Sequence, residues 1–131
     1  MNALIIAAHG SRKKESALEV AALCEKLAQK AKDPLAEISF DRVVPAFLQF
    51  AAPLLGQTIE DLVQEGARRI VVFPFFIAAG SHLLTDIPEA VEKAARAHPK
   101  VSFSITGHLG GIATIDEIIL REVVTHLNRQ A

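Results

Sequence analysis

Apolar residues recur along this chain with two different spacings. Short apolar or alternating runs predict strands over residues 4–8, 37–44, 70–73 and 101–105. Between these runs, apolar residues at helical spacing predict helices over residues 15–32, 53–66 and 86–98, with a last helix beginning at Thr114. Strands that alternate with helices along the whole chain are typical of βαβ units, and therefore of a parallel sheet.

We accordingly predict an α/β fold, with a single four-stranded parallel sheet flanked by helices. The flavodoxin-like strand order 2-1-3-4 is expected, because it gives simple right-handed connections. In this order the first and third strands lie side by side, at the point where the order of the strands reverses. A length of 131 residues fits one unit, so residues 1–131 are expected to form a single domain.

Two histidine-containing loops follow the first and third predicted strands. Residues 9–12 read His-Gly-Ser-Arg and residues 80–82 read Gly-Ser-His. The carboxyl ends of parallel strands share one edge of a sheet, so we expect His9 and His82 to lie at the edge where open α/β sheets bind ligands. His108 follows the fourth strand and could approach the same site, although a plain loop role is the alternative.

Two neutral imidazoles suit a divalent transition metal such as cobalt, nickel, iron or zinc. The chain lacks the ligand spacing of a closed tetrahedral zinc site, and two ligands leave coordination positions open. This pattern indicates a metal that is held loosely and passed on. No organic cofactor is required.

Other side chains near these loops could bind an anionic, flat ligand. Arg12 could bind a carboxylate or phosphate, while Ser11 and Ser81 are either hydrogen-bond donors or plain turn residues. Phe75 and Phe76 lie beyond the end of the third predicted strand. Two phenylalanines at this place are explained if they form an apolar wall that contacts a flat ligand or a partner subunit.

Composition narrows the class of protein. Fourteen basic and fifteen acidic residues give a formal charge of -1, which does not favour a nucleic-acid partner. A single cysteine, Cys24, excludes an internal disulfide and indicates a reducing, cytoplasmic setting. No apolar run approaches the ~20 residues that span a bilayer, so we do not expect a membrane protein.

Three segments carry a family likeness. They are residues 9–12, residues 45–48 (Pro-x-Phe-Leu), and residues 74–88, which read Pro-Phe-Phe-Ile-x-x-Gly-x-His-x-x-x-Asp-Ile-Pro. The chain resembles the small sirohydrochlorin cobaltochelatases, relatives of the class II chelatases that insert a divalent metal into a tetrapyrrole. The resemblance implies that His9 and His82 are the metal-binding and catalytic pair. It also implies that the chain is one lobe of a chelatase and pairs as a homodimer around the tetrapyrrole.

The substrate implied by this resemblance is a flat macrocycle fringed with carboxylates. Such a ligand needs an apolar wall and nearby donors, which we expect from Ser11, Arg12, Gln49, Phe75, Phe76, Gly80 and Ser81. Gln49 stands where many relatives have a glutamate, and an amide cannot accept a proton as a carboxylate can. Either that role is dispensable here or another group fills it.

The leading hypothesis is therefore a cytoplasmic sirohydrochlorin chelatase of the lyase class, in cobalamin or related tetrapyrrole biosynthesis. Cobalt is favoured as the metal, with nickel and iron as alternatives. A metal or tetrapyrrole carrier on the same scaffold is the second hypothesis. A third is phosphoryl transfer, because histidine phosphatases also begin with a strand followed by His-Gly, but those have arginine before the histidine where this chain has Ala8.

Overall fold

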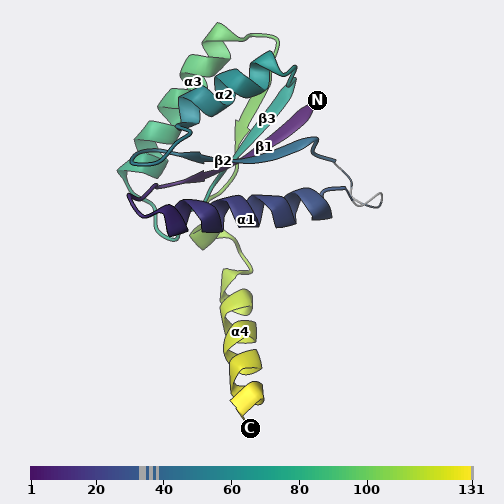
Figure 1. Cartoon of the computed structure of the whole chain (residues 1–131), viewed down its shortest axis with the longest axis vertical. Coiled ribbons are helices and arrows are strands. Elements are labelled where there is room, and N and C mark those ends of the chain that lie inside the picture. The colour runs from purple at the N-terminus through teal and green to yellow at the C-terminus, as the bar shows by residue number, and fades with distance from the viewer. Residues whose placement is uncertain (33–34, 36, 38, 131) are drawn as a thin grey trace.

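Within the residues described, the strands form one parallel sheet in the order β2-β1-β3-β4 (Figure 1). The structure, a computed structural model, describes residues 1–32, 35, 37 and 39–130, without the side chains of His82 and Leu83. The strands are β1 (Asn2–Ala8), β2 (Arg42–Phe47), β3 (Arg69–Pro74) and β4 (Ser102–Ile105). The predicted α/β fold and the predicted order 2-1-3-4 are both confirmed.

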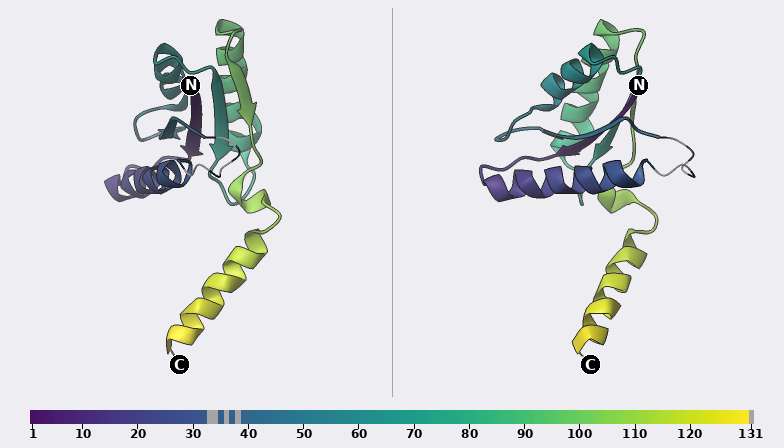
Figure 2. Two further views of the ribbon diagram at one scale, coloured as in Figure 1. Left: turned by 90° about the vertical axis from the view of Figure 1, so that its right-hand side faces the viewer. Right: turned by 45° about the vertical axis from the view of Figure 1, so that its right-hand side comes forward.

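Helices lie on both sides of this sheet. The helices are α1 (Lys14–Lys30), α2 (Leu55–Gln64), α3 (Ile87–Ala97) and α4 (Ile115–Gln130), with two short helical turns, η1 (His82–Asp86) and η2 (Leu109–Gly111). Figure 1 shows α2 and α3 together on one side of the sheet and α1 on the other. In all three views α4 points away from the rest of the molecule (Figure 2).

The central strand β1 is apolar on both faces because helices cover both. Alternate residues of a strand point to opposite faces. Ala3, Ile5 and Ala7 therefore join the core cluster beneath α2 and α3, whereas Ile6 and Ala8 join the cluster beneath α1. This double burial fixes β1 in the middle of the sheet, so the loop that follows Ala8 starts from a rigid position.

The second strand begins later than the sequence pattern predicted. The expected strand covered residues 37–44 and ended before Pro45, but β2 runs from Arg42 to Phe47 and includes that proline. Because β2 lies at the edge of the sheet, a residue without an N–H can be accommodated there. Ile38, which the expected strand also included, lies outside the described residues.

Candidate active site

The loops that follow β1, β2 and β3 lie side by side at the carboxyl edge of the sheet. The backbone N–H of Gln49 donates a hydrogen bond to the carbonyl of His9 at 3.2 Å. On the other side of β1, the N–H of Phe75 donates to the carbonyl of Ala7 at 2.8 Å. Sheet pairing thus continues past the ends of the strands and brings residues from three loops to one place.

Gly10 makes the close approach of two of these loops possible. Its φ of 99° lies in the left-handed region, which side chains with a Cβ rarely adopt. A Cβ built at this position would lie 1.7 Å from the carbonyl oxygen of Gln49. A residue other than glycine would therefore separate the His9 loop from the loop after β2.

The exposed imidazole of His9 contacts side chains from both neighbouring loops. The amide Nε2 of Gln49 lies 3.3 Å from His9 Nδ1. The ring of Phe76 meets the His9 ring edge to face, with centroids 6.2 Å apart and an interplanar angle of 64°. These two contacts orient the imidazole while leaving the side chain open to solvent.

Arg12 links the first loop to the second through an aromatic ring. Its guanidinium carbon lies 4.8 Å from the centroid of Phe50, a distance typical of a cation–π contact. Phe50 is 56% exposed and has a φ of 62°. The hydroxyl oxygen of Ser11 accepts a hydrogen bond from the backbone N–H of Lys13 at 3.1 Å, a contact within its own turn.

The second histidine lies in the segment that connects β3 to α3. The backbone of His82 begins η1, a five-residue π-helical turn, directly after the exposed residues Gly80 and Ser81. Such turns are rare and occur frequently at functional sites. The His82 ring lies outside the described part of the structure, so the expected approach of the two imidazoles stays a prediction.

Phe75 and Phe76 serve opposite sides of the sheet rather than one common wall. Phe75 packs with the cluster beneath α1, and Phe76 packs with the cluster beneath α2 and α3. Both rings are half-buried. Phe76 is the aromatic neighbour of His9, while Phe75 lines a hollow of about 270 Å³ that His9, Ser11 and Glu19 also line.

The loop after β4 supports the segment that carries Phe76. The N–H of Gly110 donates to the carbonyl of Phe76 at 2.9 Å, and a Cβ at Gly110 would lie 1.7 Å from the carbonyl oxygen of Ile77. The half-buried ring of His108 packs over Gly111 within the same loop. His108 thus packs within its own loop, as expected for a histidine that has a plain loop role.

The matching family model is that of CbiX, and it covers residues 3–126. The chain belongs to the CbiX family. It is 36% identical over 107 residues to the chloroplastic sirohydrochlorin ferrochelatase of Arabidopsis thaliana, a match that spans 82% of this chain and 44% of that protein. It is 34% identical over 88 residues to the sirohydrochlorin cobaltochelatase of Methanocaldococcus jannaschii, spanning 67% of this chain and 57% of that one. The chain thus spans about half the length of these curated relatives.

A solved structure of a CbiX protein from Marinobacter aquaeolei, described as a cobalamin (vitamin B12) biosynthesis protein, has the same fold. The two chains cover each other completely, with a TM-score of 0.72 and 24% sequence identity. The expected resemblance to the small chelatases is therefore confirmed at the level of the CbiX family and its fold.

Several apolar side chains near the site were not among the predicted site residues. Ile77 and Leu84 are each 70% exposed and lie in the segment between β3 and α3 that also contains His82. Phe50, which contacts Arg12, is the third. The signal for them in the sequence is a large apolar residue placed in a loop beyond a strand end, where no core is available to bury it.

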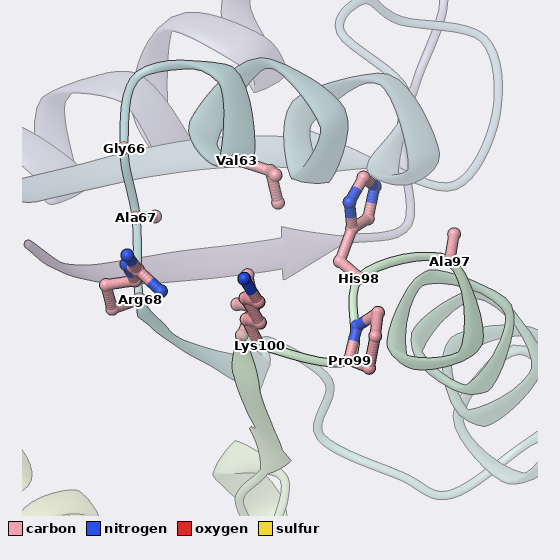
Figure 3. A pocket seen from close by; sticks show the side chains of 9 residues that line it. Val63, Gly66, Ala67, Arg68, Ala97, His98, Pro99 and Lys100 are labelled. Carbon is pink, nitrogen blue, oxygen red and sulfur yellow. The ribbon is translucent and has the colours of Figure 1, made fainter.

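A larger hollow of about 470 Å³ lies elsewhere, between the residues that precede β3 and β4 (Figure 3). Arg68, His98 and Lys100 are among its lining residues. His98 Nε2 is held at 2.9 Å by Glu60 Oε1, in an ion-pair geometry between α2 and the end of α3. This hollow opens before the strands begin and contains none of the predicted site residues, so we place the active site at the His9 edge.

Among the described side chains, no three histidines, cysteines, aspartates or glutamates are grouped closely enough to hold a metal ion. In the same part of the chain, no helix has the length and apolar character needed to cross a membrane.

Proposed function

We propose that this chain is a sirohydrochlorin chelatase, which inserts a divalent metal into the tetrapyrrole in cobalamin or related tetrapyrrole biosynthesis. The observation that carries the proposal is the exposed imidazole of His9, held by Gln49 and Phe76 at the carboxyl edge of the sheet. Sirohydrochlorin is the proposed substrate because the chain belongs to the CbiX family and because its relatives are named sirohydrochlorin chelatases. Cobalt is our first choice of metal, with nickel and iron as alternatives.

In this proposal the metal is a substrate, and His9 and His82 are the pair that handles it. Insertion requires that the ion lose water and that two pyrrolic protons be removed from the macrocycle. Imidazole can bind a metal in its neutral form and can accept protons near neutral pH. Because Gln49 contacts Nδ1, Nε2 is the nitrogen of His9 that we propose as the metal ligand.

The amide of Gln49 suits both tasks of His9. Its NH₂ group can donate to an unprotonated Nδ1, and its carbonyl can accept from a protonated one after rotation of the amide. A histidine that binds a metal through Nε2 normally donates from Nδ1 to an acceptor. We propose that Gln49 supplies this acceptor without adding a negative charge.

The exposed groups around His9 suit the shape and charge of the macrocycle. Arg12 supplies a cation for a peripheral carboxylate, and its stacking on Phe50 holds it near the site. Ile77 and Leu84 provide exposed apolar surface in the His82 segment. Backbone N–H groups at Gly80 and Ser81 are further proposed donors.

The test is an anaerobic absorbance assay with sirohydrochlorin and, in turn, Co²⁺, Ni²⁺ and Fe²⁺. We expect His9→Ala and His82→Ala to lower the insertion rate at least about 100-fold, a typical contribution of a group that moves protons. His98→Ala is the matched control, because His98 pairs with Glu60 away from the site and should leave the rate unchanged. An unchanged rate in folded His82→Ala would remove that residue from the mechanism.

A metal or tetrapyrrole carrier is the second candidate function, favoured by the amide at Gln49 in place of a carboxylate. Stoichiometric binding of metal or sirohydrochlorin without turnover would select it. Phosphoryl transfer is the third candidate. It is disfavoured because histidine phosphatases have an arginine directly before the histidine, whereas this chain has the buried residue Ala8 there. Hydrolysis of an aryl phosphate, lost in His9→Ala, would reinstate that third candidate.

We also propose that residues 1–131 act as one chelatase domain that pairs as a homodimer. The reducing cytoplasm is the proposed location, because the thiol of Cys24 persists there. Sirohydrochlorin and a divalent metal are the proposed partners, without an organic cofactor or nucleic acid.

A further inference from the structure

The hollow of about 470 Å³ that lies before β3 and β4 is large enough for a small molecule (Figure 3). Binding sites for small molecules usually measure about 300–1,000 Å³. The walls of this hollow include residues 66–68, between α2 and β3, and residues 97–101, which lead from α3 to β4. Because both segments precede their strands, the hollow lies at the amino edge of the parallel sheet, opposite the edge that carries His9. A ligand held here would be separate from the substrate of the proposed chelatase.

Backbone hydrogen bonds hold the two wall segments together. The N–H of Ser102 donates to the carbonyl of Arg68 at 2.8 Å, and the N–H of Val101 donates to the carbonyl of His98 at 3.0 Å. The ring of His98 is also fixed, because its Nε2 lies 2.9 and 3.0 Å from the two carboxylate oxygens of Glu60. The fold itself therefore sets the shape of the hollow, and a preformed site lowers the cost of binding.

The charge around this hollow is positive. Arg68, His98 and Lys100 line it, and none of its nine described lining residues is acidic. Figure 3 shows Arg68 on one side of the hollow, His98 on the other and the ammonium group of Lys100 between them. Among the described residues, neither the guanidinium of Arg68 nor the ammonium of Lys100 lies within ion-pair distance of a carboxylate.

The carboxylates at the end of α2 do not neutralise these two cations, because other side chains engage them. The pairs are Glu60 with His98, Asp61 with Gln57, and Glu65 with Arg42. Helices α2 and α3 both end beside the hollow, and each helix C-terminus contributes a partial negative charge of about half an elementary charge. These partial charges offset only part of the two full positive charges, so the hollow still attracts an anion.

We propose that this hollow binds a small dianion with an apolar body, of the chemical class of phosphate monoesters. The fork of an arginine forms paired hydrogen bonds with phosphate oxygens, and a lysine adds a compact point charge. Two cations match a dianionic head group better than a single carboxylate. The apolar body would contact the apolar part of the wall, which comprises Val63, Ala67, Ala97, Pro99 and Val101.

The first test is a calorimetric titration of the native chain with phenyl phosphate at about pH 8, where the phosphate is a dianion. We expect saturable binding that is roughly tenfold tighter than that of inorganic phosphate, which lacks the apolar body. Benzoate has the same ring but a single charge, so it should bind at least about tenfold more weakly than phenyl phosphate. Equal affinity for benzoate, or no saturation up to about 5 mM phenyl phosphate, would overturn the proposal.

Paired charge variants separate the hollow from the general charge of the surface. Arg68→Gln with Lys100→Gln should weaken the binding of phenyl phosphate at least about tenfold. Arg69→Gln with Arg96→Gln is the matched control, because it removes the same charge from neighbouring positions that do not line the hollow. Equal weakening in both double variants would indicate unspecific attraction of charge. Native affinity in the first double variant would place the ligand elsewhere, for example near Arg12, and either outcome would refute the site.

Amide NMR spectra of the native chain locate the bound ligand without any substitution. Addition of phenyl phosphate should shift the backbone amide signals of residues 66–68 and 97–101, excluding that of Pro99, and should leave those of residues 9–12 in place. Shifts confined to residues 9–12 would show that the ligand binds at the His9 edge and would overturn the proposal. Neither measurement involves a metal or a tetrapyrrole, so the outcome is independent of the proposed chelatase activity.

Discussion

The contact between Gln49 and His9 is the residue-scale feature on which the site depends. The two residues are forty positions apart, and they meet because the loops after β1 and β2 continue the sheet pairing. A carboxylate at position 49 could only accept from Nδ1, so it would hold His9 in the state in which Nε2 binds a metal.

We therefore expect Gln49→Glu to tighten the binding of Co²⁺ or Ni²⁺ by roughly tenfold, the lower end of the effect of such supporting residues on metal affinity. Calorimetry with the metal alone measures this directly. Gln64→Glu, at the exposed end of α2, adds the same charge far from the loop and should leave the affinity unchanged. Equal affinities for the native chain and Gln49→Glu would show that the contact does not control His9.

Gly10→Ala should disrupt the site and destabilise the fold. The added methyl group would collide with the carbonyl of Gln49 and would occupy a left-handed φ. A loss of about 2–4 kcal/mol in unfolding free energy is expected from strain of this kind. Gly56→Ala is the matched control, because a Cβ there meets nothing within 4 Å among the described residues and lies inside α2. Urea denaturation should show Gly56→Ala to be about 0.5–1 kcal/mol more stable than the native chain.

At the scale of elements, the alternation of strands and helices was sufficient to predict the sheet and its order. The end of β2 was not predictable, because Pro45 normally ends a strand and is tolerated here by the edge position. The π-helical turn η1 has no simple sequence signal either. The two histidine loops were predictable from strand ends, whereas the contact of His9 with Gln49 depends on register between distant segments.

The packing of α1 on the sheet has a consequence at alkaline pH. Cys24 is 2% exposed in the cluster beneath α1, and burial raises the pKa of its thiol from 9.0 to about 11. The folded chain therefore holds this proton more tightly than the unfolded chain. The stability it contributes is complete below about pH 9 and is lost as the pH rises towards 11.

Compared with Cys24→Ala, the native chain should lose up to about 2 kcal/mol of unfolding free energy between pH 9 and 11. Urea denaturation of both proteins across this range isolates the thiol from other titrating groups. Parallel pH profiles for the two proteins would mean that the thiol ionises without cost in the folded state.

At the scale of the whole molecule, α4 points away from the sheet and from the elements that cover it (Figure 2). Helix α4 follows the loop that supports Phe76 through Gly110, and none of its residues is buried. The sequence pattern predicted this helix correctly but not its direction, because an apolar face does not specify whether its own chain or another covers it.

If folding and the proposed pairing as a homodimer are coupled, the melting temperature must depend on protein concentration. Two chains combine in the folded state, so a tenfold rise in concentration stabilises the dimer by about 1.4 kcal/mol. Shared between two chains of this size, that corresponds to a rise of roughly 2 °C in melting temperature per tenfold concentration. Scanning calorimetry over two decades of concentration should show this slope for the native chain. A native melting temperature independent of concentration would mean that a second copy contributes nothing to the stability of the fold.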